Sequence, residues 1–270
     1  MNILLYAGAA PWRDLVLSYS VPIITHTATK LTLVAAEDEQ AAALLRNATE
    51  RLDLPPRVEV VQQIIPGDVQ QAVLAAAEQQ RYDLAILGRL NRPLGRLLPG
   101  PRSKAITRRL KMSVLRVHGE SRPIRRILLA SGGNIYTFDN ARLTAAIAAP
   151  LGAEVTLVHV LSQEQLCFEL IPDAQTAHEE FRYSDMMEAS VLQEAVDLLC
   201  NLRVPTRLQV RVGPVLDEIL AELATGNYDM LVVGAHRADD ALERILLEDI
   251  TSALLDHSPL PVLVVKNNHR

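Results

Sequence analysis

The sequence has few aromatic residues, few cysteines and no long apolar segment. Aromatic side chains make up 4% of the 270 residues while 49% are hydrophobic, so aliphatic side chains must fill the cores. The two cysteines, Cys167 and Cys200, form no CxxC pair and no Cys/His spacing, which excludes a zinc ribbon and favours free thiols in a reducing compartment. No apolar run approaches the ~20 residues that a membrane helix needs, and the first residues lack the basic segment of a secretory signal. We therefore expect a cytoplasmic protein that does not enter a membrane.

Charge is unevenly distributed along the chain. The formal net charge is -5, but residues 1–120 carry +4 and residues 121–270 carry -9. Ten basic residues and a single acid, Asp83, lie between Arg81 and Arg116, whereas residues 239–256 contain six acids and one base. The basic segment has three interpretations: it binds a nucleotide or another anion, it faces the acidic second half, or it is an ordinary solvated surface.

The chain repeats itself. ILLYAGAAP resembles ILLASGGN, KLTLVAA resembles EVTLVHV, RYDLAILGR resembles NYDMLVVGA, and MSVLRV resembles LPVLVV, all in the same order. The pairs Gly67 and Gly213, Tyr82 and Tyr228, and Gly88 and Gly234 share one offset of 146 positions. A polar segment, GESRP at 119–123, separates the two copies. We therefore expect two domains, residues 1–118 and 123–270.

Each copy alternates short strands, apolar on both faces, with helices. DVQQAVLAAAEQQ places Val69, Val73 and Ala76 on one side of a helix, and PVLDEILAELATG starts with Pro214 and ends at Gly226. This pattern predicts an α/β protein of two tandem Rossmann-like domains, each a five-stranded parallel open sheet with helices on both faces. Ligands bind such sheets beyond the carboxyl ends of the strands, where Gly88 and Gly234 are expected.

The order of these motifs resembles the universal stress protein family. The shared elements are Gly-Asp before a helix, YD followed by an apolar strand and glycine, a glycine-containing loop, and a closing HSPLPVLVV. The resemblance covers nearly the whole chain twice, and implies the adenine nucleotide alpha hydrolase-like type of Rossmann domain. Members that bind ATP carry a G-x2-G-x9-G-[S/T] loop, in which backbone N–H groups and a hydroxyl hold the phosphates. They also carry an Asp at the end of the first strand.

Both copies depart from this loop. In the second copy Gly234 and His236 match family positions, but Arg237 stands for the second glycine, and Glu248 and Asp249 stand where Gly-Ser is expected. In the first copy Pro101 replaces the Ser, and Ala7 or Gly8 replaces the Asp. The resemblance nevertheless gives the first copy the better candidate nucleotide site, and the residues expected to form it are Gly88, Arg89, Asn91, Gly100, Arg102 and Ser103.

The sequence therefore indicates a stress-response binding or regulatory protein with degenerate nucleotide loops. One alternative is a true ATP-binding universal stress protein that uses the first loop. Another is anion or nucleic-acid binding through the basic face at Arg81–Arg116, which the lack of interleaved aromatics does not favour. Because family members pair their closing strands in dimers, the resemblance implies that the two domains pair internally through their last strands. A homodimer is left open.

Catalysis and metal binding receive no support from the sequence. There is no Ser-His-Asp spacing and no G-x-S-x-G motif, so no enzyme is expected, and His159 and His236 are interpreted as structural. Cys200 is expected in a helix core, and Arg116 either faces solvent at an edge or forms an ion pair. Gln163–Ser184, which the first copy lacks, is interpreted as a packed excursion, a lid or a dock.

Overall fold

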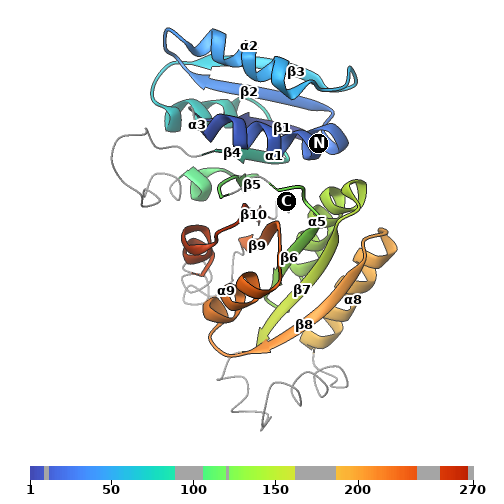
Figure 1. The fold of residues 1–270 in the computed structure, drawn as a ribbon. Coiled ribbons are helices and arrows are strands. Elements are labelled where there is room, and N and C mark those ends of the chain that lie inside the picture. Colours follow the sequence, from blue (N-terminus) through green and yellow to red (C-terminus); the bar gives the residue numbers. More distant parts are fainter. Residues whose placement is uncertain (9–11, 89–105, 120–121, 162–186, 236–249, 267–270) are drawn as a thin grey trace. The chain divides into compact units, whose positions relative to one another are not determined.

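The structure is a computed structural model that divides into two compact units (Figure 1). The first contains Met1–Pro123 and Pro259–Arg270, and the second contains Ile124–Ser258. The sequence analysis places Pro259–Arg270 in the second domain, whereas in the structure these twelve residues cluster with the first unit. The described residues are 1–8, 12–88, 106–119, 122–161, 187–235 and 250–266.

The first unit is built on a sheet with strand order β3-β2-β1-β4-β5-β10. The five strands from the first copy are all parallel, and β10 pairs with β5 in the antiparallel direction, with Leu263 opposite Leu115. Residues 106–109 are also helical. The elements are β1 (Asn2–Tyr6), α1 (Trp12–Thr27), β2 (Lys30–Ala36), α2 (Ala41–Leu52), β3 (Glu59–Ile65), α3 (Val69–Gln79), β4 (Leu84–Leu87), β5 (Ser113–Arg116) and β10 (Val262–Lys266).

Helices cover both faces of this sheet. The Gln62 side chain donates to Thr49 of α2, while the next side chain, Gln63, donates to Gln79 of α3. Because consecutive side chains of a strand point to opposite faces, α2 and α3 lie on opposite sides of β3. The central strands are apolar and buried: all four residues of β4 are inaccessible to solvent. The doubly wound α/β class predicted from the sequence is confirmed.

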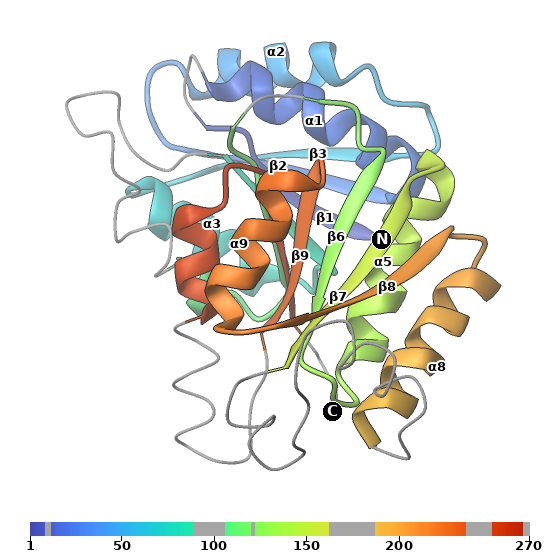
Figure 2. The same ribbon diagram turned by 60° about the horizontal axis from the view of Figure 1, so that its bottom comes forward.

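The second unit has the corresponding parallel order β9-β6-β7-β8. Figures 1 and 2 show α5 and α8 side by side, and these two helices pack against each other. Residues 250–257 form a further helix. The elements are β6 (Arg126–Ser131), α5 (Thr137–Leu151), β7 (Glu154–Leu161), α8 (Met187–Asn201), β8 (Thr206–Val212), α9 (Val215–Thr225) and β9 (Met230–Ala235).

The repeated YD motif has the same structural role in both units. Asp83 accepts the backbone N–H of Asn2 at 2.7 Å, and Asp229 accepts the backbone N–H groups of Arg125 and Arg126 at 2.9 Å. Each carboxylate therefore ties the start of the fourth strand of its copy to the start of the first. The motif is explained by the fold and needs no ligand.

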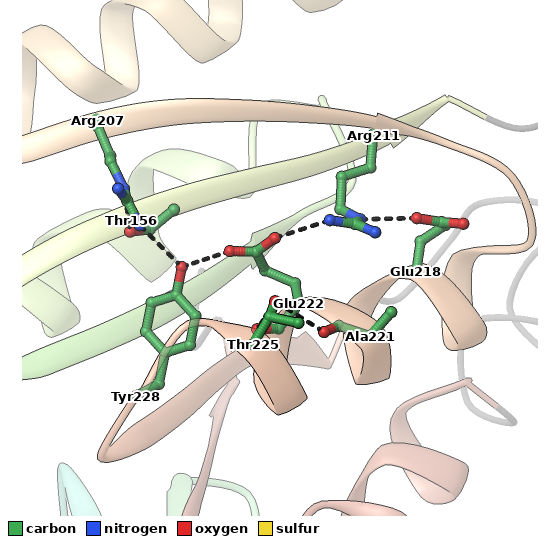
Figure 3. Close-up of polar contacts among 8 residues, drawn as sticks. All are labelled: Thr156, Arg207, Arg211, Glu218, Ala221, Glu222, Thr225 and Tyr228. Atoms are coloured by element: carbon green, nitrogen blue, oxygen red, sulfur yellow. Dashed lines mark hydrogen bonds and ion pairs between the residues drawn. The ribbon is translucent and has the colours of Figure 1, made fainter. Parts of the chain in front are cut away.

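The two units differ in the side-chain contacts between the edge strand and the helix that follows it. In the second unit Arg211 of β8 donates to Glu218 at 2.7 Å and to Glu222 at 2.9 Å, both on α9 (Figure 3). The Tyr228 hydroxyl donates to Glu222 at 2.7 Å, and Arg207 donates to Thr156 at 2.9 Å. At the offset of 146 positions the first copy has Ile65, Ala72 and Ala76 in place of Arg211, Glu218 and Glu222. An ionic network thus replaces apolar packing at the same place in the fold.

Several local predictions can be checked directly. α3 begins after Asp68, which forms a capping box with Gln71, and buries Val73 and Ala76 as expected. Pro214 and Gly226 are the caps of α9, as predicted.

One expectation about a single residue is wrong, and for a second residue one of two alternatives is excluded. Cys200 is exposed, because it lies on the face of α8 that points to solvent. Arg116 does not face solvent at an edge: it is 8% exposed, since β5 lies between β4 and β10.

Candidate functional site

In each unit the strand order reverses beside the first strand of the copy. β1 lies between β2 and β4, and β6 lies between β7 and β9. The connections after β1 and β4 leave the sheet on opposite sides of this point, so a crevice is expected beyond the carboxyl ends of these strands.

Gly88 follows β4 at the crevice of the first unit, as the sequence predicts. Its N–H donates to the carbonyl of Tyr6 at 3.0 Å. A Cβ atom at this position would lie 2.7 Å from Val16 Cγ2 and 2.9 Å from the Ala7 carbonyl oxygen, so only glycine fits. The close approach of β4 to β1 and α1 therefore requires this glycine, with or without a ligand.

Tyr6 ends β1 beside Gly88 and packs against the buried cluster that includes Leu87 and Ile106. Burial, with a smaller contribution from the negative charge of Asp38, raises the pKa of the Tyr6 phenol to about 12. The phenol is thus neutral at physiological pH. Tyr6 is thus a neutral, partly buried side chain directly before Ala7 and Gly8, one of which stands where the resemblance expects an Asp.

The crevice of the second unit contains hydroxyl groups that bind each other. Ser131 ends β6, and its Oγ lies 2.8 Å from Thr137 Oγ1 at the start of α5. The backbone N–H of Gly133, which has a φ of 72°, donates to the same Ser131 Oγ at 3.1 Å. Ser131 and Gly132 stand where the resemblance expects the strand-one Asp, and the Ser131 hydroxyl closes the turn between β6 and α5.

His159 lies under this turn. It is 3% exposed, and its Nδ1 lies 3.0 Å from the Ser131 carbonyl oxygen. A carbonyl only accepts, so Nδ1 carries the proton. Its Nε2 lies 3.7 Å from Glu188 of α8, and a Cβ on Gly133 would come 3.0 Å from its Cε1. These contacts join β6, β7 and α8, in line with the structural role expected for His159. Ser131 and His159 stand at the same distance from the starts of their strands, Arg126 and Glu154, and this equal spacing is the signal in the sequence that could place them side by side.

Of the predicted site residues, Gly88 and Gly234 are described. Gly234 lies in β9, and its carbonyl oxygen is 3.5 Å from Thr251 Oγ1 in helix 250–257. The structure thus places both glycines at the carboxyl ends of the fourth strands, as predicted. The remaining predicted residues lie outside the described residues: Arg89, Asn91, Gly100, Arg102, Ser103 and His236.

Other features of the described residues are less suited to a ligand. No group of three or more His, Cys, Asp and Glu side chains could hold a metal ion in the described part of the chain. A shallow cavity of about 330 Å³ lies between α5 and α8, on the helices and not at the strand ends. Among the described residues no helix is both long and apolar enough to span a membrane. The cavity is lined by Phe138, Arg142, Glu194, Asp197, Leu198 and Asn201.

The strand order, the parallel sheets and the position of the glycines define the protein as a doubly wound α/β protein whose two units share one strand order. The sequence model of the Universal stress protein family matches residues 123–266. The chain therefore belongs to the universal stress protein family.

Solved structures agree on the fold over the full length. A universal stress protein from Archaeoglobus fulgidus is 15% identical, with a TM-score of 0.64 and 98% of both chains covered. A putative universal stress protein from Pseudomonas aeruginosa is 19% identical with a TM-score of 0.67, covering 98% of this chain and 92% of its own. A protein of unknown function from Pseudomonas aeruginosa is 17% identical with a TM-score of 0.67, covering 99% and 93%. No curated protein matches the sequence.

Proposed function

We propose that this universal stress protein acts by binding and regulation in the stress response, in the cytoplasm and without catalysing a reaction, and that its loops no longer bind nucleotide. One observation carries the proposal: the polar groups described at the two crevices are used by the fold. The N–H of Gly88 donates to Tyr6, and the hydroxyl of Ser131 bonds to Thr137 and Gly133. A phosphate that bound the N–H of Gly88 or of Gly133 would have to displace its present hydrogen bond, which costs the energy of each bond that is not replaced.

Binding of ATP through the first loop is the second candidate. The sequence of this loop supports it, because Gly100 and Ser103 keep two family positions and Arg89 and Arg102 add positive charge. Gly88 alone does not distinguish the two candidates, since packing already requires a glycine there.

Anion or nucleic-acid binding by the basic face is less well supported. Arg116, the last basic residue of the segment, is 8% exposed and adds little to such a face, although Arg108, Arg109 and Lys111 are exposed. Pairing of the two copies through their last strands remains part of the proposal, and the antiparallel register of β5 with β10 supports it.

Calorimetric titration of the purified protein with Mg-ATP tests the proposal. We expect no binding tighter than ~100 μM and no thermal shift. Binding below that value, abolished by Gly100→Glu, which copies the residue of the second repeat, would establish the ATP candidate instead. Gln79→Glu is the matched control, because it adds the same charge on an exposed residue of α3 while its side-chain oxygen can still accept from Gln63.

A further inference from the structure

The edge strand β3 presents unpaired backbone groups at alternate residues. The N–H of Glu59 donates to Thr29 at 3.0 Å, and the carbonyl of Ile65 accepts from Glu37 at 2.9 Å. In a strand the N–H and C=O of one residue point to the same side, and successive residues alternate. The odd-numbered residues of β3 therefore face β2. Val60, Gln62 and Ile64 point their backbone groups outward, where the described part of the first unit has no further strand.

Little in the sequence of β3 protects this edge. From Val60 to Ile65 the strand carries no charge, and Ile64 is 43% exposed. The single charge of the strand, Glu59, is engaged with Lys30 of β2 at 3.0 Å. Protein edges are normally blocked by charges, prolines or bulges, because open edges pair with other chains. Of these features β3 has only a proline, Pro66, which follows the strand and ends its row of backbone N–H donors.

The corresponding edge of the second unit differs at two positions. β8 is the terminal strand there, and Arg207 and Arg211 stand where β3 has Val61 and Ile65. Arg211 is paired with Glu218 and Glu222 of its own unit, as Glu59 is with Lys30, so neither edge is protected by an unpaired charge at these positions. The two edges differ in that β8 carries bulky polar side chains there, whereas β3 is uncharged from Val60 to Ile65.

We propose that β3 pairs with β3 of a second copy of this chain, antiparallel and with Gln62 on the two-fold axis. In this register Gln62 lies opposite Gln62, and Val60 lies opposite Ile64, so that every outward residue meets another outward residue. The side chains match as well, because an aliphatic pair flanks an amide pair on each side and Ile64 is covered. A second copy fits better than a charged peptide, since the stretch from Val60 to Ile65 has no charge to select one.

Charge exchange at the two-fold axis tests this pairing. We expect the unmodified protein to sediment at twice its monomer mass of 29.7 kDa. Gln62→Lys and Gln62→Glu each place like charges opposite each other and should each be monomeric, whereas an equal mixture of the two should dimerise. Gln193→Lys and Gln193→Glu, on the exposed face of α8, are the controls and should not change the mass. A monomeric unmodified protein, or a mixture of folded variants that stays monomeric, would overturn the proposal.

Amide hydrogen exchange followed by NMR gives a residue-level test. In the dimer the outward amides of Val60, Gln62 and Ile64 should be protected, and this protection should disappear in Gln62→Lys. The amides of Val61 and Gln63 face β2 and should stay protected in both, which shows that the strand is still folded. A dimer in which the outward amides exchange freely would place the interface elsewhere and refute the pairing. This result does not depend on whether ATP binds.

Discussion

The ionic network of the second unit allows a quantitative prediction for Glu222. This carboxylate is 8% exposed and accepts from Arg211 at 2.9 Å and from Tyr228 at 2.7 Å (Figure 3). Glu222→Ala removes both bonds. The Tyr228 hydroxyl then keeps a contact of 3.4 Å with Arg207, and Arg211 keeps its bond to Glu218.

The expected cost follows from these contacts. A hydrogen bond to a charged group contributes ~1.5–3 kcal/mol, so two such bonds set an upper limit of ~6 kcal/mol. The side chain of Arg211 is 26% exposed and retains Glu218, so water and the second carboxylate compensate part of the loss. We expect Glu222→Ala to lower the free energy of unfolding by about 2–3 kcal/mol.

The first copy supplies the complementary variant. Arg211→Ile, Glu218→Ala and Glu222→Ala together install the residues found at Ile65, Ala72 and Ala76. Apolar side chains that replace a buried ionic network are often neutral, so the triple variant should lie within ~1.5 kcal/mol of the unmodified protein. Glu222→Ala alone, at about 2–3 kcal/mol, should therefore already exceed the triple loss, and the sum of the three single losses should exceed it further.

Urea unfolding followed by far-ultraviolet circular dichroism measures these differences. The single tryptophan, Trp12, belongs to α1 in the first unit, so its fluorescence reports the unit that carries no change. If the three single losses simply add up to the triple loss, the residues do not act as one network and the reasoning fails.

Three further predictions concern buried or capping groups. Because the pKa of Tyr6 is raised to about 12 from an unfolded value near 10, the folded protein keeps the phenol proton that the unfolded chain loses, so stability should fall as pH rises through this window; Tyr6→Phe should flatten this part of a pH series of denaturation midpoints. The amide of Asn140 is fully buried in α5 and finds no hydrogen-bond partner within the described structure, so Asn140→Ala should raise the melting temperature by a few degrees, ~1 kcal/mol, and a clear decrease would contradict this. Lys266 Nζ donates to the carbonyls of Thr107 and Leu110 at the end of helix 106–109, so Lys266→Met should lower the free energy of unfolding by ~1–2 kcal/mol. The urea midpoint followed by Trp12 fluorescence should fall accordingly, and an unchanged midpoint would show that this cap contributes nothing.

The sequence predicts those parts of the fold that arise from local pattern. The apolar strands and the caps of α9 follow from residue types and spacing. The pairing of β10 with β5 is not such a local feature, because two apolar strands do not by themselves specify each other, and it was expected only from the resemblance to a family that pairs its closing strands. The burial of Arg116 has the same cause. Cys200 was misplaced because a helix with several apolar residues still has a solvent face, and one residue type does not determine on which face it lies.

The candidate site shows how far a glycine motif can be interpreted. A glycine after the fourth strand fits a phosphate loop, and it equally fits a strand that approaches a helix closely. The distances from an added Cβ at Gly88 to Val16 and Ala7 show that packing alone forbids any other residue. A family could therefore lose nucleotide binding and still keep this glycine, while the residues that contact only the ligand would be free to change. Ser131 fits this view: together with Gly132 it stands where the resemblance expects the Asp, and its hydroxyl bonds to Thr137 within the fold. The informative positions for ligand binding are therefore those at which the fold itself requires no particular residue.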